Sequence, residues 1–217
     1  MPRTTHSDVH LLTVCGSLQR RSSNRAALDV VAAAALAAGA VVDDFDRLAE
    51  LPAFDPDRED EAIAALDDWR RRIDAADVVV VAAPEYAGAV AGAVKNAFDW
   101  LVGSGGMYRK PVAVVSVGTS GGAHARQMMI QTLTWQGAHV VAELGIAAPR
   151  TKSDADGRIT DATTLDALGA LTGRLLAAPE APGEQLVAAV GRLVERFGID
   201  PVHVAPAGCQ LGGPGVQ

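Results

Sequence analysis

Residues 77–83 read DVVVVAA, an apolar run rich in β-branched side chains. Such a run is typical of a central strand buried on both faces of a parallel sheet. Four further strands are predicted, at residues 9–15, 40–45, 112–117 and 139–144. Amphipathic segments alternate with the strands, at residues 24–38, 58–75, 92–102 and 123–136. This alternation predicts a five-stranded parallel sheet of the α/β class, with right-handed crossovers and helices on both faces.

The C-terminal third carries two more predicted helices, at residues 163–178 and 184–197. The sequence AAPEAPG at residues 177–183 separates them, and residues 200–217 are rich in glycine and proline. We expect residues 1–180 to form one domain, and residues 181–217 to form a helical extension with a flexible tail. The extra helix is amphipathic, so it should cover a face of the sheet or join a subunit interface.

Composition narrows the functional classes. The chain has 217 residues and a net charge of −7, which disfavours binding to nucleic acid or to an anionic membrane. No uninterrupted apolar run reaches the length of a membrane span. The two cysteines, Cys15 and Cys209, are too few for a disulfide framework or a zinc site of their own, so no metal site is predicted. We expect a cytoplasmic protein of one main domain.

Three unusual loops follow the first, third and fourth predicted strands, at residues 16–24, 84–92 and 118–122. In a parallel sheet, ligands bind beyond the carboxyl ends of the strands, where these loops would meet. The first loop opens a helix and offers three hydroxyls and an amide, from Ser17, Ser22, Ser23 and Asn24. A helix N-terminus with such donors favours a phosphate, although the same residues also serve as ordinary helix caps. The loop lacks the glycine spacings of ATP-binding and dinucleotide-binding loops.

The second loop combines a proline, two glycines and Tyr86, and could lie against a flat ligand. The third loop, GTSGG at residues 118–122, is short of side chains and offers backbone amides. Either loop alone is also compatible with a plain connection between elements. His124 follows the third loop and could reach a ligand, but a solvated position at the start of a helix is the simpler interpretation.

Three stretches together resemble the NADPH-dependent FMN reductase family, which includes quinone, chromate and azo-dye reductases. They are GSLQRRSSN (16–24), PEYAGAVAGAVKNAFDWL (84–101) and KPVAVVSVGTSGGAHARQMMIQTLTWQGAHVV (110–141). The resemblance covers residues 9–145 and implies a flavodoxin-like three-layer sandwich with strand order 2-1-3-4-5. It also implies non-covalently bound FMN, NADPH or NADH as co-substrate, and a homodimer or homotetramer.

By this resemblance, the FMN phosphate would be surrounded by Ser17, Gln19, Ser22, Ser23 and Asn24. The isoalloxazine ring would be bordered by Pro84, Glu85, Tyr86, Ala87 and Gly88, and its other edge by Ser120, Gly121 and Gly122. Three residues depart from the family pattern: Gln19 replaces an arginine, Ala87 an asparagine and Ala91 a proline. The first two departures weaken the polar site, and the third is expected to loosen the second loop.

The implied function is ping-pong oxidoreduction, from NAD(P)H to FMN and then to a soluble acceptor. Acceptors of this kind are quinones, free flavins, azo compounds and metal oxyanions. Because the flavin carries the chemistry, no catalytic side chain is assigned. The alternative is a non-catalytic electron carrier or flavin-binding protein that acts through a partner. The 2′-phosphate of NADPH would need a basic partner, for which the candidates are Arg20, Arg21, Arg109 and Arg126.

Overall fold

The computed structural model describes residues 9–201 and residue 204. Its central sheet holds the parallel strands β1 (His10–Cys15), β2 (Val41–Phe45), β3 (Val78–Ala82), β6 (Pro111–Gly118) and β7 (His139–Ala147). Their order is β2-β1-β3-β6-β7, so the predicted order 2-1-3-4-5 is confirmed. β4 (Glu85–Tyr86) and β5 (Ala89–Val90) form a separate short antiparallel hairpin.

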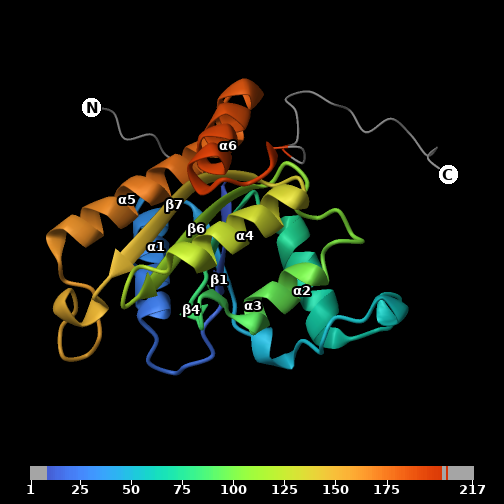
Figure 1. Ribbon diagram of the computed structural model, residues 1–217, viewed down its shortest axis with the longest axis horizontal. Helices are drawn as coiled ribbons and strands as arrows, with labels where there is room; N and C mark the ends of the chain where they lie inside the picture. The colour runs from blue at the N-terminus through green and yellow to red at the C-terminus, as the bar shows by residue number, and fades with distance from the viewer. Residues whose placement is uncertain (1–8, 202–203, 205–217) are drawn as a thin grey trace.

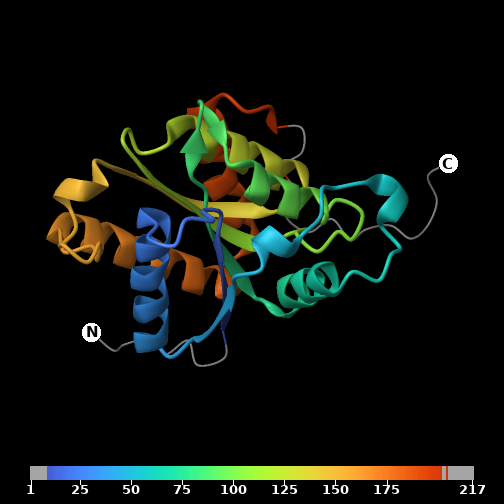
Figure 2. The ribbon, with the colours of Figure 1, turned by 90° about the horizontal axis from the view of Figure 1, so that it is seen from below.

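Helices cover both faces of this sheet (Figure 1). α1 (Ser23–Ala37) and α5 (Ala162–Ala177) lie on one face, and α2 (Ala64–Ala75), α3 (Gly92–Asp99) and α4 (Ala123–Trp135) lie on the other (Figure 2). α6 (Gly183–Phe197) packs against the edge strand β7 and against α4. The molecule is therefore the three-layer sandwich that the alternating pattern predicts.

β3 explains why the core has two halves. All five of its residues are buried, and their side chains alternate between the faces. Val79 and Val81 pack with the α2, α3 and α4 side chains, whereas Val78 and Val80 pack with those of α1 and α5. In the edge strand β2 the first four residues alternate between exposed and half-buried, and only the last, Phe45, is buried.

Two predicted helix boundaries and one predicted loop differ from the structure. α2 begins at Ala64 rather than at residue 58, because Asp55 caps a separate 3-10 turn at Pro56–Arg58. α3 ends at Asp99 rather than at residue 102, since the chain turns after Trp100. The second loop, predicted as irregular, contains the β4–β5 hairpin.

α6 buries its apolar side within the chain's own fold. Val190 and Val194 belong to the same buried cluster as the α2, α3 and α4 side chains. This helix therefore covers the sheet, which was one of the two expected roles. The predicted tail, residues 200–217, lies largely outside the described residues, and Cys209 lies entirely outside them. Within the described part of the chain, no helix is long and apolar enough to cross a membrane.

Candidate functional site

The three unusual loops meet at the carboxyl edge of β1, β3 and β6, which are neighbours in the sheet. Gly16, directly after β1, donates its backbone N–H to the carbonyl of Ala82 at 2.8 Å. A Cβ atom on Gly16 would lie 2.9 Å from that carbonyl and 3.0 Å from the Pro84 ring. Glycine is thus needed where the first loop crosses the start of the second.

The first loop leads into α1 through a capped helix start. Ser22 is the N-cap, and its hydroxyl oxygen accepts the Asn24 backbone N–H at 3.2 Å. A hydroxyl that accepts one hydrogen bond can still donate its own proton, so Ser22 can cap the helix and bind an anion. Ser17 and Ser23 are half-exposed and Gln19 is exposed, so all three side chains are accessible to a ligand.

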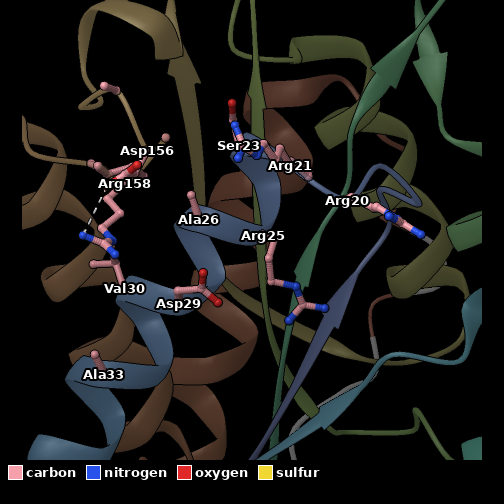
Figure 3. A pocket seen from close by; sticks show the side chains of 14 residues that line it. Arg20, Arg21, Ser23, Arg25, Ala26, Asp29, Val30, Ala33, Asp156 and Arg158 are labelled. Carbon is pink, nitrogen blue, oxygen red and sulfur yellow. Dashed lines mark ion pairs between the residues drawn. The ribbon is translucent and has the colours of Figure 1, made fainter.

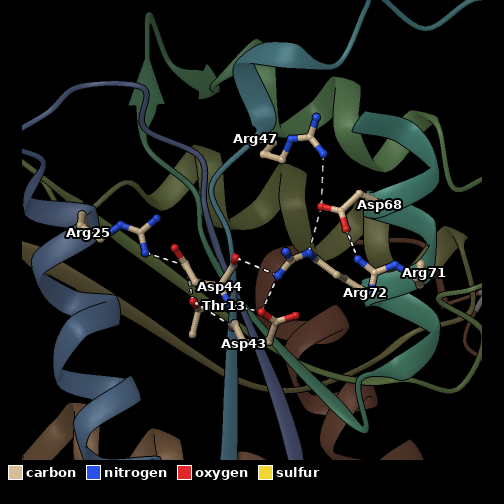
Figure 4. A network of polar contacts seen from close by, with 8 residues as sticks. All are labelled: Thr13, Arg25, Asp43, Asp44, Arg47, Asp68, Arg71 and Arg72. Atoms are coloured by element: carbon tan, nitrogen blue, oxygen red, sulfur yellow. Dashed lines mark hydrogen bonds and ion pairs between the residues drawn. The ribbon is translucent and has the colours of Figure 1, made fainter. Parts of the chain in front are cut away.

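Asn24 locks this helix start onto the sheet. Its buried side-chain amide donates to the Val117 carbonyl and accepts the Val117 N–H, both at 3.0 Å. Arg25, one residue on, forms an ion pair with Asp44 at 2.7 Å, and Asp44 also accepts the Thr13 hydroxyl (Figure 4). These contacts fix the direction in which the free N–H groups of α1 point.

The second loop is a tight hairpin. Its two turn residues, Ala87 and Gly88, have φ angles of 52° and 74°. Positive φ at both positions is the signature of a type I′ turn, for which Asn-Gly is the preferred sequence. Alanine at residue 87 therefore carries backbone strain that asparagine would carry less of. The turn presents Tyr86 to solvent, with 57% of its surface exposed.

The expectation that Ala91 loosens this loop is to be weighed against a hydrogen bond that its backbone forms. Ala91 donates its backbone N–H to the carbonyl of Pro84 at 3.0 Å, closing the base of the hairpin. A proline at residue 91 has no N–H and could not form this bond. The replacement therefore adds a hydrogen bond to the loop.

Glu85 connects the second loop to the third. One of its carboxylate oxygens accepts the backbone N–H groups of His124 and Ala125, at 2.9 and 3.1 Å. α4 has no cap of its own, because its N-cap residue is Gly122. A carboxylate at a helix N-terminus satisfies free donors and opposes the positive end of the helix dipole. The side chain of Glu85 therefore organises the site, a role that the sequence reasoning missed.

Gly122 is needed at the start of α4. Its φ is +62°, and a Cβ atom there would lie 1.9 Å from the Ser116 hydroxyl. The hydroxyl itself is fully buried and has no hydrogen-bond partner. The neighbouring Ser120 pairs with Ala147 at the end of β7, which pins the outer side of the third loop.

A buried ion-pair cluster supports the third loop from behind. Arg126 donates its Nε hydrogen to the Gly121 carbonyl at 3.1 Å and pairs with Glu143, whose side chain is only 5% exposed. Arg196 of α6 pairs with the same carboxylate, and both arginines lie over the Phe197 ring. The signal for this cluster was Glu143 itself, the one carboxylate in a strand of mostly apolar residues.

The arrangement fits FMN by the chemistry of its donors. Hydroxyls and free N–H groups at the start of α1 suit a phosphate without a metal ion. No atom lies within 4 Å of a Cβ built on Gly88 or on Gly118, so the hairpin tip and the end of β6 leave room for a flat group. Among the described residues, no group of three or more His, Cys, Asp or Glu could hold a metal ion.

The remaining candidates lie at the margins of the site. The His124 side chain is mostly exposed, and its Nδ1 atom is 3.8 Å from Glu85. Cys15 is buried at the end of β1, and this burial raises the pKa of its thiol. A protonated, buried thiol packs as a small apolar side chain rather than reacting.

Comparison with known proteins agrees with the geometry. Residues 9–152 match the family model described as NADPH-dependent FMN reductase. An NAD(P)H-dependent FMN reductase of Pseudomonas aeruginosa is 32% identical over 165 residues, covering 71% of this chain and 86% of the relative. A quinone reductase of Escherichia coli is 30% identical over 181 residues, covering 78% and 93%.

A solved structure confirms the fold. The flavoenzyme FerB of Paracoccus denitrificans, an NAD(P)H:acceptor oxidoreductase, superposes with a TM-score of 0.67 at 24% identity. The match covers 79% of this chain and 97% of that one. The extent of the family match and the identity of the relatives decide the assignment, and the predicted resemblance is confirmed. The chain is an oxidoreductase that belongs to the NADPH-dependent FMN reductase family.

Proposed function

We propose that this chain holds FMN at the junction of the three loops and uses NAD(P)H to reduce small soluble acceptors. Quinones, free flavins, azo compounds and metal oxyanions are the acceptor classes. The observation that carries the proposal is the junction itself, where a capped helix start, a strained hairpin and a glycine-rich loop are joined by hydrogen bonds. The names of the relatives in Pseudomonas aeruginosa and Escherichia coli support the same chemistry.

The phosphate of FMN would be held at the start of α1. The Ser17, Ser22 and Ser23 hydroxyls and the backbone N–H groups before α1 supply the donors, and Gln19 adds a neutral amide. Asn24 acts indirectly, since both ends of its amide are bound to Val117. Because Gln19 replaces an arginine, the positive end of the helix dipole supplies much of the attraction.

The ring would be bordered by the backbone of residues 84–88 on one side and of residues 120–122 on the other. Glu85 holds the two borders at a fixed separation, because its carboxylate is bonded to α4 while its backbone belongs to the hairpin. When bound, FMN supplies the redox chemistry by accepting a hydride from NAD(P)H and passing electrons to the acceptor. The chain orients the reactants and needs no side-chain acid or base.

We further propose that NAD(P)H and the acceptor occupy the same open face in turn. The exposed Tyr86 marks the solvent side of the hairpin, so a flat co-substrate can enter beside it. Steady-state rates with varied NADPH and benzoquinone test this order. Parallel double-reciprocal lines are expected, whereas intersecting lines would show that both substrates bind together. No turnover at all, with flavin bound, would support the electron-carrier alternative.

A homodimer or homotetramer remains part of the proposal, but through a different surface from the one expected. The apolar sides of α3 and α6 are buried within the chain, through Phe98 and Val194 among others. A groove between α3 and α4 instead exposes Val102, Met128 and Trp135. Analytical ultracentrifugation of the wild type and of Val102→Glu tests whether this groove is the contact between subunits.

A further inference from the structure

The C-terminal helix α6 ends against α4, the helix that the third loop opens. The backbone carbonyl of Phe197, in the last turn of α6, accepts a hydrogen bond from the Gln127 side-chain amide at 2.9 Å. The last carbonyls of a helix have no partner within the helix, so this contact satisfies one of them. The Phe197 ring lies against two guanidinium groups, with the Cζ atoms of Arg126 and Arg196 at 5.7 and 5.4 Å from its centroid. The end of α6 is therefore attached to the beginning of α4.

Glu143 of β7 joins the same two helices through one carboxylate. Its Oε2 atom pairs with Arg126 of α4, and its Oε1 atom pairs with Arg196 of α6. The side chains of Glu143 and Arg126 are 5% and 11% exposed, whereas that of Arg196 is 62% exposed. A buried carboxylate is costly unless both of its oxygens have partners, so the position of Glu143 depends on both arginines.

An ion pair elsewhere on the chain shows the contrast. Arg158 and Asp156 lie beside the pocket between α1 and residues 155–159 (Figure 3). They are 3.7 Å apart, and their side chains are 78% and 74% exposed. Such exposed pairs contribute little, because water screens both charges. The pair of Arg196 with Glu143 differs, since one partner is almost fully buried, and its loss would leave that carboxylate with one cation instead of two.

Arg126 carries the contact from α6 on to the third loop. Its Nε hydrogen is donated to the Gly121 carbonyl at 3.1 Å. Gly145 of β7 leaves the space for this arrangement. A Cβ atom there would lie 2.6 Å from the Arg126 Nη2 atom and 2.6 Å from the Gly121 carbonyl oxygen. The guanidinium group is thus enclosed between β7 and the third loop, so a shift of Arg126 would also move Gly121.

We infer that α6 clamps the third loop in the position where it borders the flavin ring, and that this clamp keeps FMN bound as a resident cofactor instead of an exchanging substrate. The inference rests on the proposed function, in which residues 120–122 form one border of the ring. Arg196 is a positioning residue, since it acts through Glu143 and Arg126. Because α6 follows residues 9–152, the part that matches the family model, the clamp is an addition to the family's common fold.

The clamp acts on the ring border and not on the phosphate loop. The start of α1 is held by separate contacts, from the Asn24 side chain to the backbone of Val117. Loosening the clamp should therefore weaken riboflavin, which has the ring but no phosphate, as much as it weakens FMN. Partial unfolding would instead lower the number of binding sites per chain without changing the affinity of those that remain.

The test titrates riboflavin and FMN calorimetrically into the FMN-free wild type, Arg196→Ala, Arg196→Lys and Arg192→Ala. Arg192 is an exposed arginine about one turn earlier in α6 that lines the groove between α5 and α6, so its replacement is a matched control. We expect Arg196→Ala to raise the Kd of both ligands about fivefold, which corresponds to about 1 kcal/mol. Arg196→Lys keeps the charge and should stay within about twofold of the wild type, and Arg192→Ala should match the wild type.

The rate of FMN release gives a second readout. FMN should leave Arg196→Ala about fivefold faster than the wild type, because affinity differences among variants of one site fall mostly in dissociation.

Equal affinities of Arg196→Ala and the wild type would overturn the inference. So would a loss confined to FMN, fewer sites at unchanged affinity, an equal loss in Arg192→Ala, or an Arg196→Lys variant as weak as Arg196→Ala. A wild type that binds neither ligand would refute the proposed function instead.

Discussion

Replacing Glu85 tests whether one carboxylate holds the second and third loops together. Glu85→Ala removes the carboxylate that accepts the His124 and Ala125 backbone N–H groups at the start of α4. The N-cap residue Gly122 has no side chain that could replace it. Loss of a helix cap costs about 0.5–2 kcal/mol, and loss of the favourable charge at the N-terminus about 0.3–1 kcal/mol. With 19% of its side chain exposed, Glu85 is only partly screened by solvent.

The sum is a destabilisation of about 1–3 kcal/mol, and a domain of this size loses about 2–4 °C in Tm for each kcal/mol. We therefore expect Glu85→Ala to melt about 2–12 °C below the wild type. Glu85→Gln keeps an oxygen acceptor and loses only the charge, so its Tm should fall by about 1–4 °C. FMN affinity should fall in the same order, because the two borders of the ring lose their link.

Calorimetry on the FMN-free proteins gives the cleanest comparison, since bound ligand adds its own stabilisation. Glu180→Ala, which removes an exposed carboxylate far from the site, serves as the control and should melt with the wild type. The reasoning is refuted if Glu85→Ala melts within 1 °C of the wild type. It is also refuted if Gln and Ala at residue 85 are equally harmful, because the cap would then contribute only through its charge.

Three further predictions concern the loops and the polar network. Ala87→Asn should stabilise the chain by about 0.5–1 kcal/mol in urea unfolding, because asparagine tolerates positive φ better than alanine; Ala87→Val should destabilise it, and the opposite order would rule out turn strain. Gly122→Ala should cost about 2–4 kcal/mol and weaken FMN binding measured by fluorescence quenching, since its Cβ would strike Ser116. A wild-type melting curve for this variant would show that the loop can readjust. Partial burial alone would raise the pKa of Asp68, but hydrogen bonds and charge from Arg72 and Arg71 outweigh it and lower the pKa (Figure 4). Asp68→Asn should therefore cost about 1 kcal/mol at pH 7. The difference in stability between the two proteins should disappear as the pH falls from about 4 through the lowered pKa of Asp68. A difference that does not change with pH would contradict this prediction.

The sheet was predictable from sequence because each strand carries its own signal. The run of four valines in β3 predicts a central strand, and the alternation of β-branched and alanine-rich segments leaves few other topologies. The loops could be placed for the same reason, since parallel strands bring their carboxyl ends to one edge. The α2 boundary failed because Arg58 and Glu61 continue a helical pattern that the Asp55 cap and Pro56 break.

The supporting contacts of the site could not be predicted, because they join residues far apart in the chain. Asn24 and Val117 are 93 positions apart, and Glu85 and Ala125 are 40 apart. The residues next to Glu85 in the sequence would be the same whether its carboxylate capped a distant helix or lay in solvent. The Ala87 turn is a contrasting case, since a two-residue turn ending in Gly88 between short extended segments is a hairpin signal that sequence alone could have supplied.

The central claim is that this site binds FMN and lets NAD(P)H reduce it. The most direct test is the visible absorption spectrum of the FMN-loaded protein, recorded without oxygen before and after one equivalent of NADPH. We predict flavin bands that bleach on mixing and return when benzoquinone is added. Bands that remain at full intensity, in a protein that holds its flavin, would contradict the account.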